Sequence, residues 1–279
     1  MMAKITWKGI DIKEATALTF KILKLVMPVS GVGMVSTMCL FLALVYYWFL
    51  LPYQLFTYPI LLTLILFLIA HWILVNTLYN YILAILIHPG KSKGSGPSKC
   101  RQCRTNRPER SHHCKTCGYC VLLMDHHCLW INNCVGYYNY GYFMKACIYA
   151  WLGAAYGTLT LLPEVFAFSD EKSVIFLYQD LPNLCIIAWC ICLAVLVGFT
   201  IMNGWFLYLI SLGMTSIEYK QLSAWKTGVV SPYSRGSWAN IAFALGVRDG
   251  RWSMLLRPCY FVPYNYWSTV DLEAVETQY

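Results

Sequence analysis

Residues 100–136, CRQCRTNRPERSHHCKTCGYCVLLMDHHCLWINNCVG, decide how the rest of this chain is interpreted. From Cys100 to Cys134, 35 residues hold seven of the 13 cysteines and four of the six histidines. Thiols and imidazoles at such short spacings are what tetrahedral zinc sites require. Two four-ligand sites need eight ligands, and this stretch offers eleven candidates. The sequence therefore predicts two zinc sites and leaves a surplus of reactive groups.

The surplus includes a thiol in the tetrapeptide Asp125-His126-His127-Cys128. A thiol is mostly protonated near neutral pH, so an adjacent imidazole promotes nucleophilic attack by accepting the proton. A carboxylate that holds this imidazole fixes its tautomer and stabilises the imidazolium. If His126 is the base, Asp125 orients it and His127 is left for a metal. The spacing also allows the alternative in which both histidines and Cys128 bind zinc.

The composition places most of the remaining chain in a membrane. Hydrophobic residues make up 58% of the 279 residues and charged residues only 12%, about half the charged share of a soluble domain. Four apolar stretches are each about as long as a helix that crosses the hydrocarbon core, namely 29–51, 59–87, 143–162 and 184–212. We predict an all-α integral membrane protein with four transmembrane helices and the zinc-binding cysteine-rich domain between helices 2 and 3.

The basic residues predict the orientation in the membrane. The N-terminal tail through Lys24 holds five Lys/Arg, the loop 88–142 eight, and the chain after Leu212 six. The connection 52–58 holds none, and the connection 163–183 holds one lysine against four acids. The positive-inside bias therefore predicts that both termini and the cysteine-rich loop are cytosolic. In that reducing compartment, the cysteines of the loop are expected to bind metal or react rather than form disulfides.

The predicted organisation has five segments. They are a cytosolic tail (1–28), helices 1 and 2 (29–87), the cytosolic zinc domain (88–141), helices 3 and 4 (142–212) and a cytosolic C-terminal tail (213–279). The net charge of +8 is explained by this topology and by contact with anionic lipid. The lipid bilayer is therefore a predicted partner, and nucleic acid is not.

The stretch 100–136 resembles the cysteine-rich domain of the DHHC family of protein S-acyltransferases (palmitoyltransferases). Three further stretches are similar to signatures of that family. They are His88-Pro89-Gly90 (Asp-Pro-Gly in the family), Thr215-Ser216-Ile217-Glu218 (Thr-Thr-x-Glu), and PYSRGSWANIAFALG at 232–246, with Asn240 at the family's asparagine. The resemblance covers about residues 30–257, and the family's four helices complete it.

The resemblance implies two structural zinc ions, each bound by three cysteines and one histidine. One set is Cys100, Cys103, His113 and Cys120, and the other is Cys114, Cys117, His127 and Cys134, with His112 no ligand. It implies further that Cys128 is the acylated nucleophile, His126 its general base and Asp125 the group that orients the base. The residues expected to pack the tail against the active-site loop are Thr215, Ser216, Glu218 and Asn240.

The reaction implied by the resemblance is a ping-pong transfer. Palmitoyl-CoA or another long-chain acyl-CoA acylates Cys128, and a cytosolic cysteine of a membrane-associated substrate protein then receives the acyl group. The ER or Golgi membrane is the expected location. The enzyme is expected to act either with an accessory subunit or as a homo-oligomer, or with neither, and the sequence does not distinguish these cases. Leu129 departs from the family's usual proline, which would restrict Cys128 toward extended geometry.

Two alternatives accompany these predictions. In the third helix, Gly153, Tyr156 and Gly157 either permit close helix packing or face an acyl cavity with room for chains longer than palmitate. For the whole protein, the alternative is a zinc-binding interaction module on a membrane anchor. That module explains the metal ligands, but not a cysteine beside an Asp-His pair at the membrane surface. A transporter is disfavoured, because the spans hold few ionisable groups.

Overall fold

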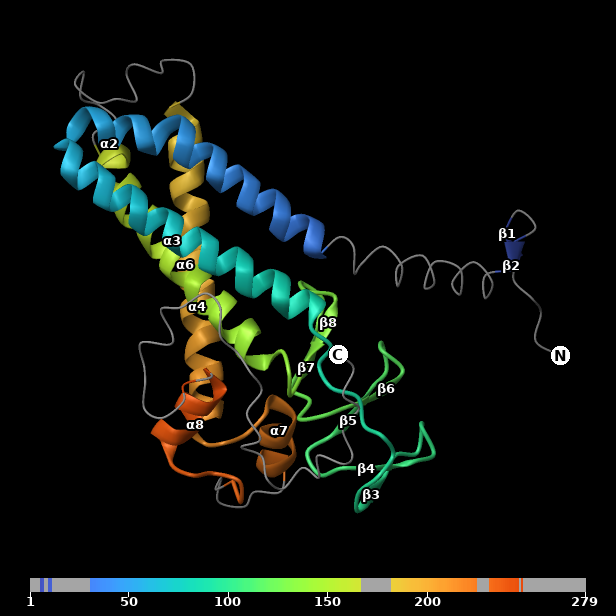
Figure 1. The fold of residues 1–279 in the computed structure, drawn as a ribbon. Helices are drawn as coiled ribbons and strands as arrows, with labels where there is room; N and C mark the ends of the chain where they lie inside the picture. Colours follow the sequence, from blue (N-terminus) through green and yellow to red (C-terminus); the bar gives the residue numbers. More distant parts are fainter. Residues whose placement is uncertain are drawn as a thin grey trace.

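Four long helices form a bundle, and the cysteine-rich domain lies at one end of it (Figure 1). The computed structural model describes residues 6–7, 10–11, 31–166, 182–224, 231–245 and 247. Most of the predicted tail 1–28, and the chain after residue 247, lie outside the described residues. Within the first tail, the short strands β1 (Thr6–Trp7) and β2 (Ile10–Asp11) pair antiparallel.

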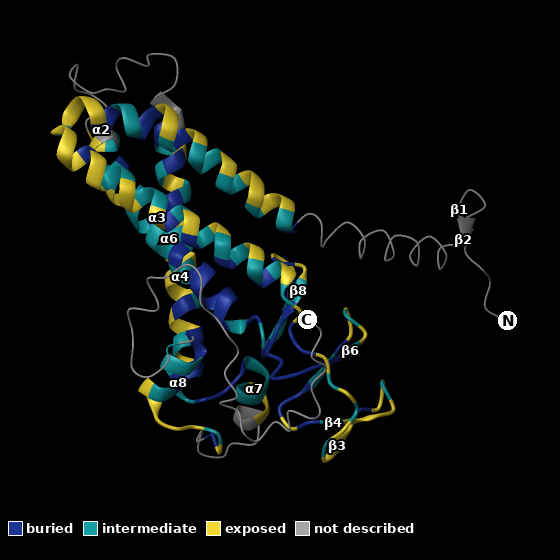
Figure 2. Cartoon of the chain, in the orientation of Figure 1, coloured by how far each residue is buried: buried dark blue, intermediate teal, exposed yellow. Residues whose placement is uncertain are grey.

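Four helices in the described part of the chain are long and apolar enough to cross a membrane. They are Gly31–Thr57, Ile60–Leu86 (α3), Tyr140–Pro163 within α4 (Tyr140–Phe166), and Cys185–Ser211 within α6 (Pro182–Ser211). Exposed positions run along the first helix, α3 and α6, and they include large apolar side chains such as Leu61 and Ile201, whereas most of α4 is buried or half-buried (Figure 2). Such side chains suit contact with lipid. The predicted four-helix membrane fold with an inserted cysteine-rich domain is confirmed.

The first helix continues through residues 52–57, which the sequence predicts as part of a connection. A π-helical turn, η1 (Tyr46–Leu50), leads directly into α2 (Leu51–Thr57). The Leu51 N–H donates to the Tyr46 carbonyl across this wider turn. Pro52 then lies in the first turn of α2, directly after this wider turn. The prediction of a loop is therefore wrong for residues 52–57.

The cysteine-rich domain is built from three small antiparallel hairpins. They pair β3 (Ser98–Lys99) with β4 (Asn106–Arg107), β5 (His112–Cys114) with β6 (Tyr119–Val121), and β7 (His126–Cys128) with β8 (Asn133–Val135). Two-stranded sheets of this size are not stable in water by themselves. The domain therefore depends on cross-links and on its contacts with the helices.

Two asparagines join this domain to the end of α3. The last carbonyl groups of a helix have no partner within the helix. Asn133 Nδ2 donates to the Ile85 carbonyl at 3.1 Å, and Asn139 Nδ2 donates to the carbonyl groups of Ala84 (3.2 Å) and Cys134 (2.8 Å). Asn139 is fully buried. The amides thus satisfy the helix end and fix its position against β8.

Two short helices complete the same end of the bundle. Helix α7 (Ser216–Ala224) follows α6, and α8 (Ser237–Ala244) lies further along the chain. Figure 1 shows both near the cysteine-rich domain rather than near α2. Helix α8 also packs against α6 and α4. Segments that are more than 80 residues apart in sequence therefore meet at this end.

We expect Asn139→Leu to destabilise the protein, because the Cys134 carbonyl loses the Asn139 amide as a donor and the Ala84 carbonyl keeps only the longer bond from Asn133, at 3.4 Å. Leaving such groups unpaired costs about 2 kcal/mol. Thermal unfolding in detergent measures the effect, and Asn106→Leu at the exposed end of β4 is the control. Equal melting temperatures for the two variants would contradict this role of Asn139.

Candidate active site

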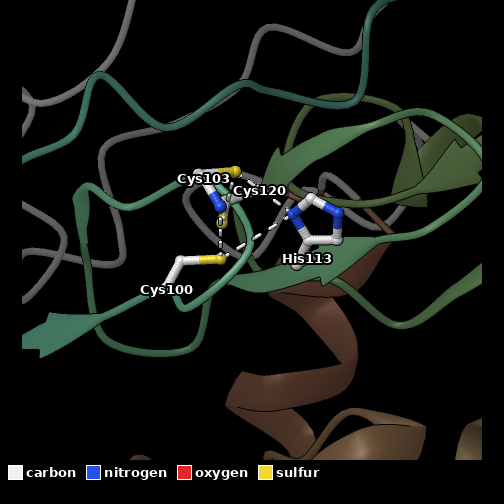
Figure 3. A group of neighbouring side chains, drawn as sticks. All are labelled: Cys100, Cys103, His113 and Cys120. Atoms are coloured by element: carbon white, nitrogen blue, oxygen red, sulfur yellow. Dashed lines mark hydrogen bonds between the residues drawn. The ribbon is translucent and has the colours of Figure 1, made fainter.

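Four side chains of the cysteine-rich domain converge in a first cluster, as Figure 3 shows: Cys100, Cys103, His113 and Cys120. The Cys103 sulfur lies 3.1 Å from His113 Nδ1 and 3.8 Å from the Cys120 sulfur. A tetrahedral zinc ion with Zn–S bonds of about 2.3 Å requires sulfur atoms about 3.8 Å apart. The donor set and its spacing therefore fit zinc.

The second cluster consists of Cys114, Cys117, His127 and Cys134. His127 Nδ1 lies 3.6, 3.5 and 3.5 Å from the sulfur atoms of Cys114, Cys117 and Cys134. These distances are again those of a tetrahedral site. His112 lies outside both clusters in the described part of the chain.

Both clusters have the same local construction. In each, a histidine and a cysteine are direct partners across a hairpin: His113 faces Cys120 in β5–β6, and His127 faces Cys134 in β7–β8. A tight Cys-x-x-Cys turn supplies the other two thiols. In the second cluster, the Cys117 N–H donates to the Cys114 sulfur at 3.3 Å. The spacing of the motif thus follows from one turn and one hairpin per site.

The thiols of the first cluster differ in acidity. The backbone N–H of Cys103 holds the pKa of Cys100 at about 7, whereas burial raises the pKa of Cys120 to about 12. A zinc ion binds thiolates, so it must displace the proton of Cys120 as it binds. The folded hairpins and the bound metal therefore stabilise each other.

The surplus groups form a connected chain of side chains. His126 Nδ1 donates to Asp125 Oδ2 at 2.8 Å. This bond leaves the other ring nitrogen of His126 to interact with Cys128. Burial by itself would lower the pKa of His126, but hydrogen bonds with Asp125 and Cys128 raise it to about 9. Cys128 is buried, with 6% of its surface exposed.

Two aromatic rings from the membrane helices hold the His126 imidazole. Phe206 of α6 stacks on it, with 5.7 Å between centroids and 22° between planes. Phe143 of α4 approaches it edge to face at 5.3 Å. Because the two phenylalanines also contact each other at 5.6 Å, the three rings form one packed group. The imidazole is therefore oriented by the helices as well as by Asp125.

Asp125 is held in turn by the start of α7. Its carboxylate is almost completely buried, with 1% exposed. Oδ1 accepts from the Ser216 backbone N–H at 2.8 Å, and Oδ2 accepts from the Ser216 hydroxyl at 2.9 Å. Both carboxylate oxygens of Asp125 therefore accept hydrogen bonds from Ser216. Ser216 lies 91 residues after Asp125, so only the fold brings them together.

The start of α7 is itself fixed by Thr215 and Glu218. The Thr215 N–H donates to Glu218 Oε2 at 2.8 Å, and the Glu218 N–H donates to the Thr215 hydroxyl at 3.3 Å. This reciprocal pair is a capping box. Glu218 also accepts two bonds from Arg110 of the zinc domain, at 2.5 and 2.7 Å. The guanidinium and the carboxylate are both largely buried, so this ion pair ties α7 to the zinc domain.

Asn240 in α8 joins the C-terminal segment to the end of α6. Its Nδ2 donates to the Ser211 carbonyl and to the Ser234 hydroxyl, both at 3.0 Å. Its Oδ1 accepts from the Arg235 N–H at 3.2 Å. The chain leaves α6 at Gly213 with a φ of +72°, a conformation that favours glycine. Asn240 therefore supports the segment from which Ser216 reaches Asp125.

A cavity of about 640 Å³ opens between the zinc domain, α7 and residues 231–233. Its lining includes Arg107, His112, Gln221 and Tyr233. Arg107 Nη1 lies 3.2 Å from His112 Nδ1. Since a guanidinium only donates, His112 must accept at Nδ1 and carry its proton at Nε2. Burial and Arg107 lower the pKa of His112, which keeps the ring neutral. The cavity therefore offers a guanidinium and an imidazole N–H as donors.

The three residues predicted for an acyl cavity lie elsewhere, in α4. A Cβ on Gly157 would lie 2.8 Å from the Cys192 sulfur of α6, and one on Gly153 would lie 3.4 Å from Ile73 of α3. The Tyr156 hydroxyl donates to the Leu66 carbonyl at 3.3 Å. These contacts agree with close helix packing at Gly153 and Gly157.

Several residues of the site escape prediction from the sequence alone. Nothing in their local pattern marks Phe143 and Phe206 as neighbours of His126, since both lie in apolar stretches. The link from Arg110 to Glu218 is equally non-local. One signal was available: Thr215 and Glu218 have the spacing of a capping box, which predicts a helix beginning at Ser216.

We expect His113→Ala to lower the zinc content by one ion per chain, because the first cluster loses its nitrogen ligand. His112→Ala, at the adjacent residue, should leave the zinc content at the wild-type value. Elemental analysis of the purified proteins measures both. Loss of zinc from His112→Ala with retention in His113→Ala would contradict the ligand set.

Comparison with known proteins agrees with this arrangement. Residues 93–223 match the family model of the DHHC palmitoyltransferases. The chain is 31% identical over 202 residues to probable protein S-acyltransferase 15 of Arabidopsis thaliana, an alignment that covers 63% of this chain and 77% of the relative. The chain is also 32% identical over 208 residues to probable protein S-acyltransferase 16 of the same plant. This alignment covers 63% of the chain and 70% of the relative. The chain is 45% identical over 92 residues to palmitoyltransferase ZDHHC16A of Danio rerio. This alignment covers 31% of the chain and 24% of the relative. The match to the family model and to these relatives, together with the two clusters that could hold a metal ion and the four membrane helices, shows that the chain belongs to the DHHC family of protein S-acyltransferases.

Proposed function

We propose that this enzyme transfers a long-chain acyl group from acyl-CoA to Cys128 and then to cysteines of membrane-associated proteins. The connected set from Ser216 through Asp125 and His126 to Cys128 is the observation that carries the proposal. It supplies a nucleophile, a base and a group that orients the base. Its position at one end of four membrane helices suits a thioester whose acyl tail enters the bilayer.

In the first step, the Cys128 sulfur attacks the thioester carbonyl of acyl-CoA. His126 carries the proton that Cys128 gives up, and Asp125 holds the orientation of the imidazole ring. The bond between the carbonyl carbon and the CoA sulfur breaks, and CoA leaves as a thiol after receiving the proton from His126. The products are the Cys128 thioester and free CoA.

In the second step, the thiol of a substrate cysteine attacks the Cys128 thioester. His126 accepts the proton of that thiol and returns it to the Cys128 sulfur as the acyl group leaves. The substrate becomes an S-acyl protein, and Cys128 is again a thiol. The same base serves both steps, since both are exchanges of one thioester for another.

The donors of the 640 Å³ cavity suit the anionic head group of acyl-CoA. Arg107 and the Nε2–H of His112 line this cavity, and phosphate groups accept from such donors. Glu218 lines it as well, next to the Ser216 that holds Asp125. We assign the CoA head group to this cavity and the acyl chain to the helix bundle. It stays a prediction that the length of the acyl chain is determined by Gly153, Tyr156 and Gly157.

The two clusters would hold zinc through Cys100, Cys103, His113 and Cys120, and through Cys114, Cys117, His127 and Cys134. With four protein ligands each, such sites are structural, and the metal supplies cross-links between the hairpins. The hairpins then keep Cys128 at the end of the bundle. The ligands are assigned no part in the acyl transfer.

The setting of the reaction follows from the distribution of charge. The basic residues of the cysteine-rich loop favour its placement in the cytosol, where acyl-CoA is available. The substrate proteins would then present cytosolic cysteines close to the membrane. We place the enzyme in the ER or Golgi membrane, with both termini in the cytosol. Action with an accessory subunit and action as a homo-oligomer are both compatible with this proposal.

We expect Ser216→Ala to slow the acylation of Cys128 about tenfold, because the Asp125 carboxylate loses a charge-assisted hydrogen bond. Ser216→Thr keeps a hydroxyl at this position and should restore most of the rate. Single-turnover labelling with palmitoyl-CoA measures both variants at equal zinc content. A wild-type rate in Ser216→Ala would refute the role of its hydroxyl.

The decisive test is hydroxylamine-sensitive labelling of the purified protein with a clickable palmitoyl-CoA. We expect label on the wild type and none on Cys128→Ser, with equal zinc in both. Cys190→Ser, which removes an exposed thiol of α6, is the matched control and should keep its label. Absence of label from the zinc-loaded wild type would instead support the interaction module.

A further inference from the structure

The first membrane helix contacts the segment that follows Cys128 at Gly31. Gly31 is buried, and a Cβ placed on it would lie 2.4 Å from the Leu129 carbonyl oxygen and 3.0 Å from the carbonyl carbon. Real Cβ atoms do not approach that closely, so any side chain here must move the helix or the Leu129 backbone. The absence of a side chain therefore permits the contact.

In the half of the first helix that contains Gly31, no other residue is buried before Val45. Val45, Phe49 and Leu50 further along belong to a packed core. The first helix is thus anchored at its far end and meets the zinc domain at Gly31. A displacement at Gly31 would pass to Leu129 directly.

A second group, from α3, holds the same segment. The Tyr81 hydroxyl of α3 donates to the Trp130 carbonyl at 2.8 Å. Tyr81 packs against the core cluster that contains Cys128. The side chains of Leu129 and Trp130 are 43% and 50% exposed, so packing of these side chains does little to hold the segment. Its backbone carbonyl groups carry the restraint.

The segment controls the geometry of the nucleophile through one turn. The Asn132 N–H donates to the Leu129 carbonyl at 3.3 Å, which closes the turn between β7 and β8. Cys128 is the last residue of β7 and pairs with Asn133 at the start of β8. The Leu129 carbonyl is therefore shared between this turn and the Gly31 contact. Leucine at 129 leaves Cys128 without the restraint that a following proline would impose.

We infer that Gly31 and Tyr81 are positioning residues that clamp the Leu129–Trp130 backbone and thereby hold Cys128 in its reactive geometry. The inference rests on the proposed function for its activity readout. The clamp does the work that a proline after the nucleophile would otherwise do. It also makes the reactivity of Cys128 depend on the position of the first membrane helix.

The test compares Gly31→Ala with Gly33→Ala in the full-length, zinc-loaded protein. Both changes raise helix propensity equally, but a Cβ on Gly33 meets no atom within 4 Å. We expect Gly31→Ala to slow single-turnover acylation of Cys128 by about tenfold or more, because a small misplacement of a reacting group is costly. The KM for palmitoyl-CoA and the zinc content should match those of Gly33→Ala. Equal acylation rates in the two variants overturn the inference.

Tyr81→Phe decides the case in which Gly31→Ala loses zinc or unfolds. It removes only the hydroxyl that binds the Trp130 carbonyl, and it should slow acylation with the zinc content unchanged. A wild-type rate in Tyr81→Phe overturns the clamp.

A readout that needs no acyl transfer separates this inference from the proposed function. The rate at which iodoacetamide alkylates Cys128, followed by peptide mass spectrometry, measures the reactivity of the thiol directly. If the wild type forms no acyl-enzyme, the proposed function fails. A different alkylation rate in Gly31→Ala than in Gly33→Ala would still support the clamp, and equal rates would overturn it.

Discussion

The buried carboxylate of Asp125 is the constraint on which the site depends. An ionised carboxylate withdrawn from water is costly unless donors surround it. Here the donors are His126 within the zinc domain and the Ser216 N–H and hydroxyl from α7. The zinc domain and α7 therefore dock together or leave a buried charge unpaired. The position of the base next to Cys128 follows from this docking.

The other contacts around the site also hold His126 and Cys128 in position. The ion pair between Arg110 and Glu218 fixes the start of α7 against the zinc domain, and Asn240 fixes the segment between α6 and α8. On the membrane side, Phe143 and Phe206 orient the imidazole. A reactive group gains most when its neighbours are themselves held in place. The nucleophile lies where the metal-linked hairpins meet the helix bundle, and both parts restrain it.

Local chemistry made much of this protein predictable. The grouping of the zinc ligands followed from the family resemblance, and the structure gives its physical basis: each cluster uses a tight Cys-x-x-Cys turn and one pair across a short hairpin. The membrane helices were identifiable because a span needs a long apolar run. Where local signals compete, prediction failed. The sequence placed a connection at 52–58, between two apolar stretches, but a π-helical turn at 46–50 lets the helix continue to Thr57.

By itself, the sequence determined the four membrane helices, the dense group of zinc-ligand residues and the adjacency of Asp125, His126 and Cys128, because each depends on residues close together in the chain. The division of the ligands into two sets came from the family resemblance. Only the tertiary structure decided how these parts act on one another. Ser216 binds Asp125 across 91 residues, Phe206 stacks on His126, and Gly31 meets the Leu129 carbonyl. The physical reason is that a long apolar run specifies that a helix spans the membrane but not which partner it faces. The partner is chosen by the few polar groups that must be satisfied at the helix ends.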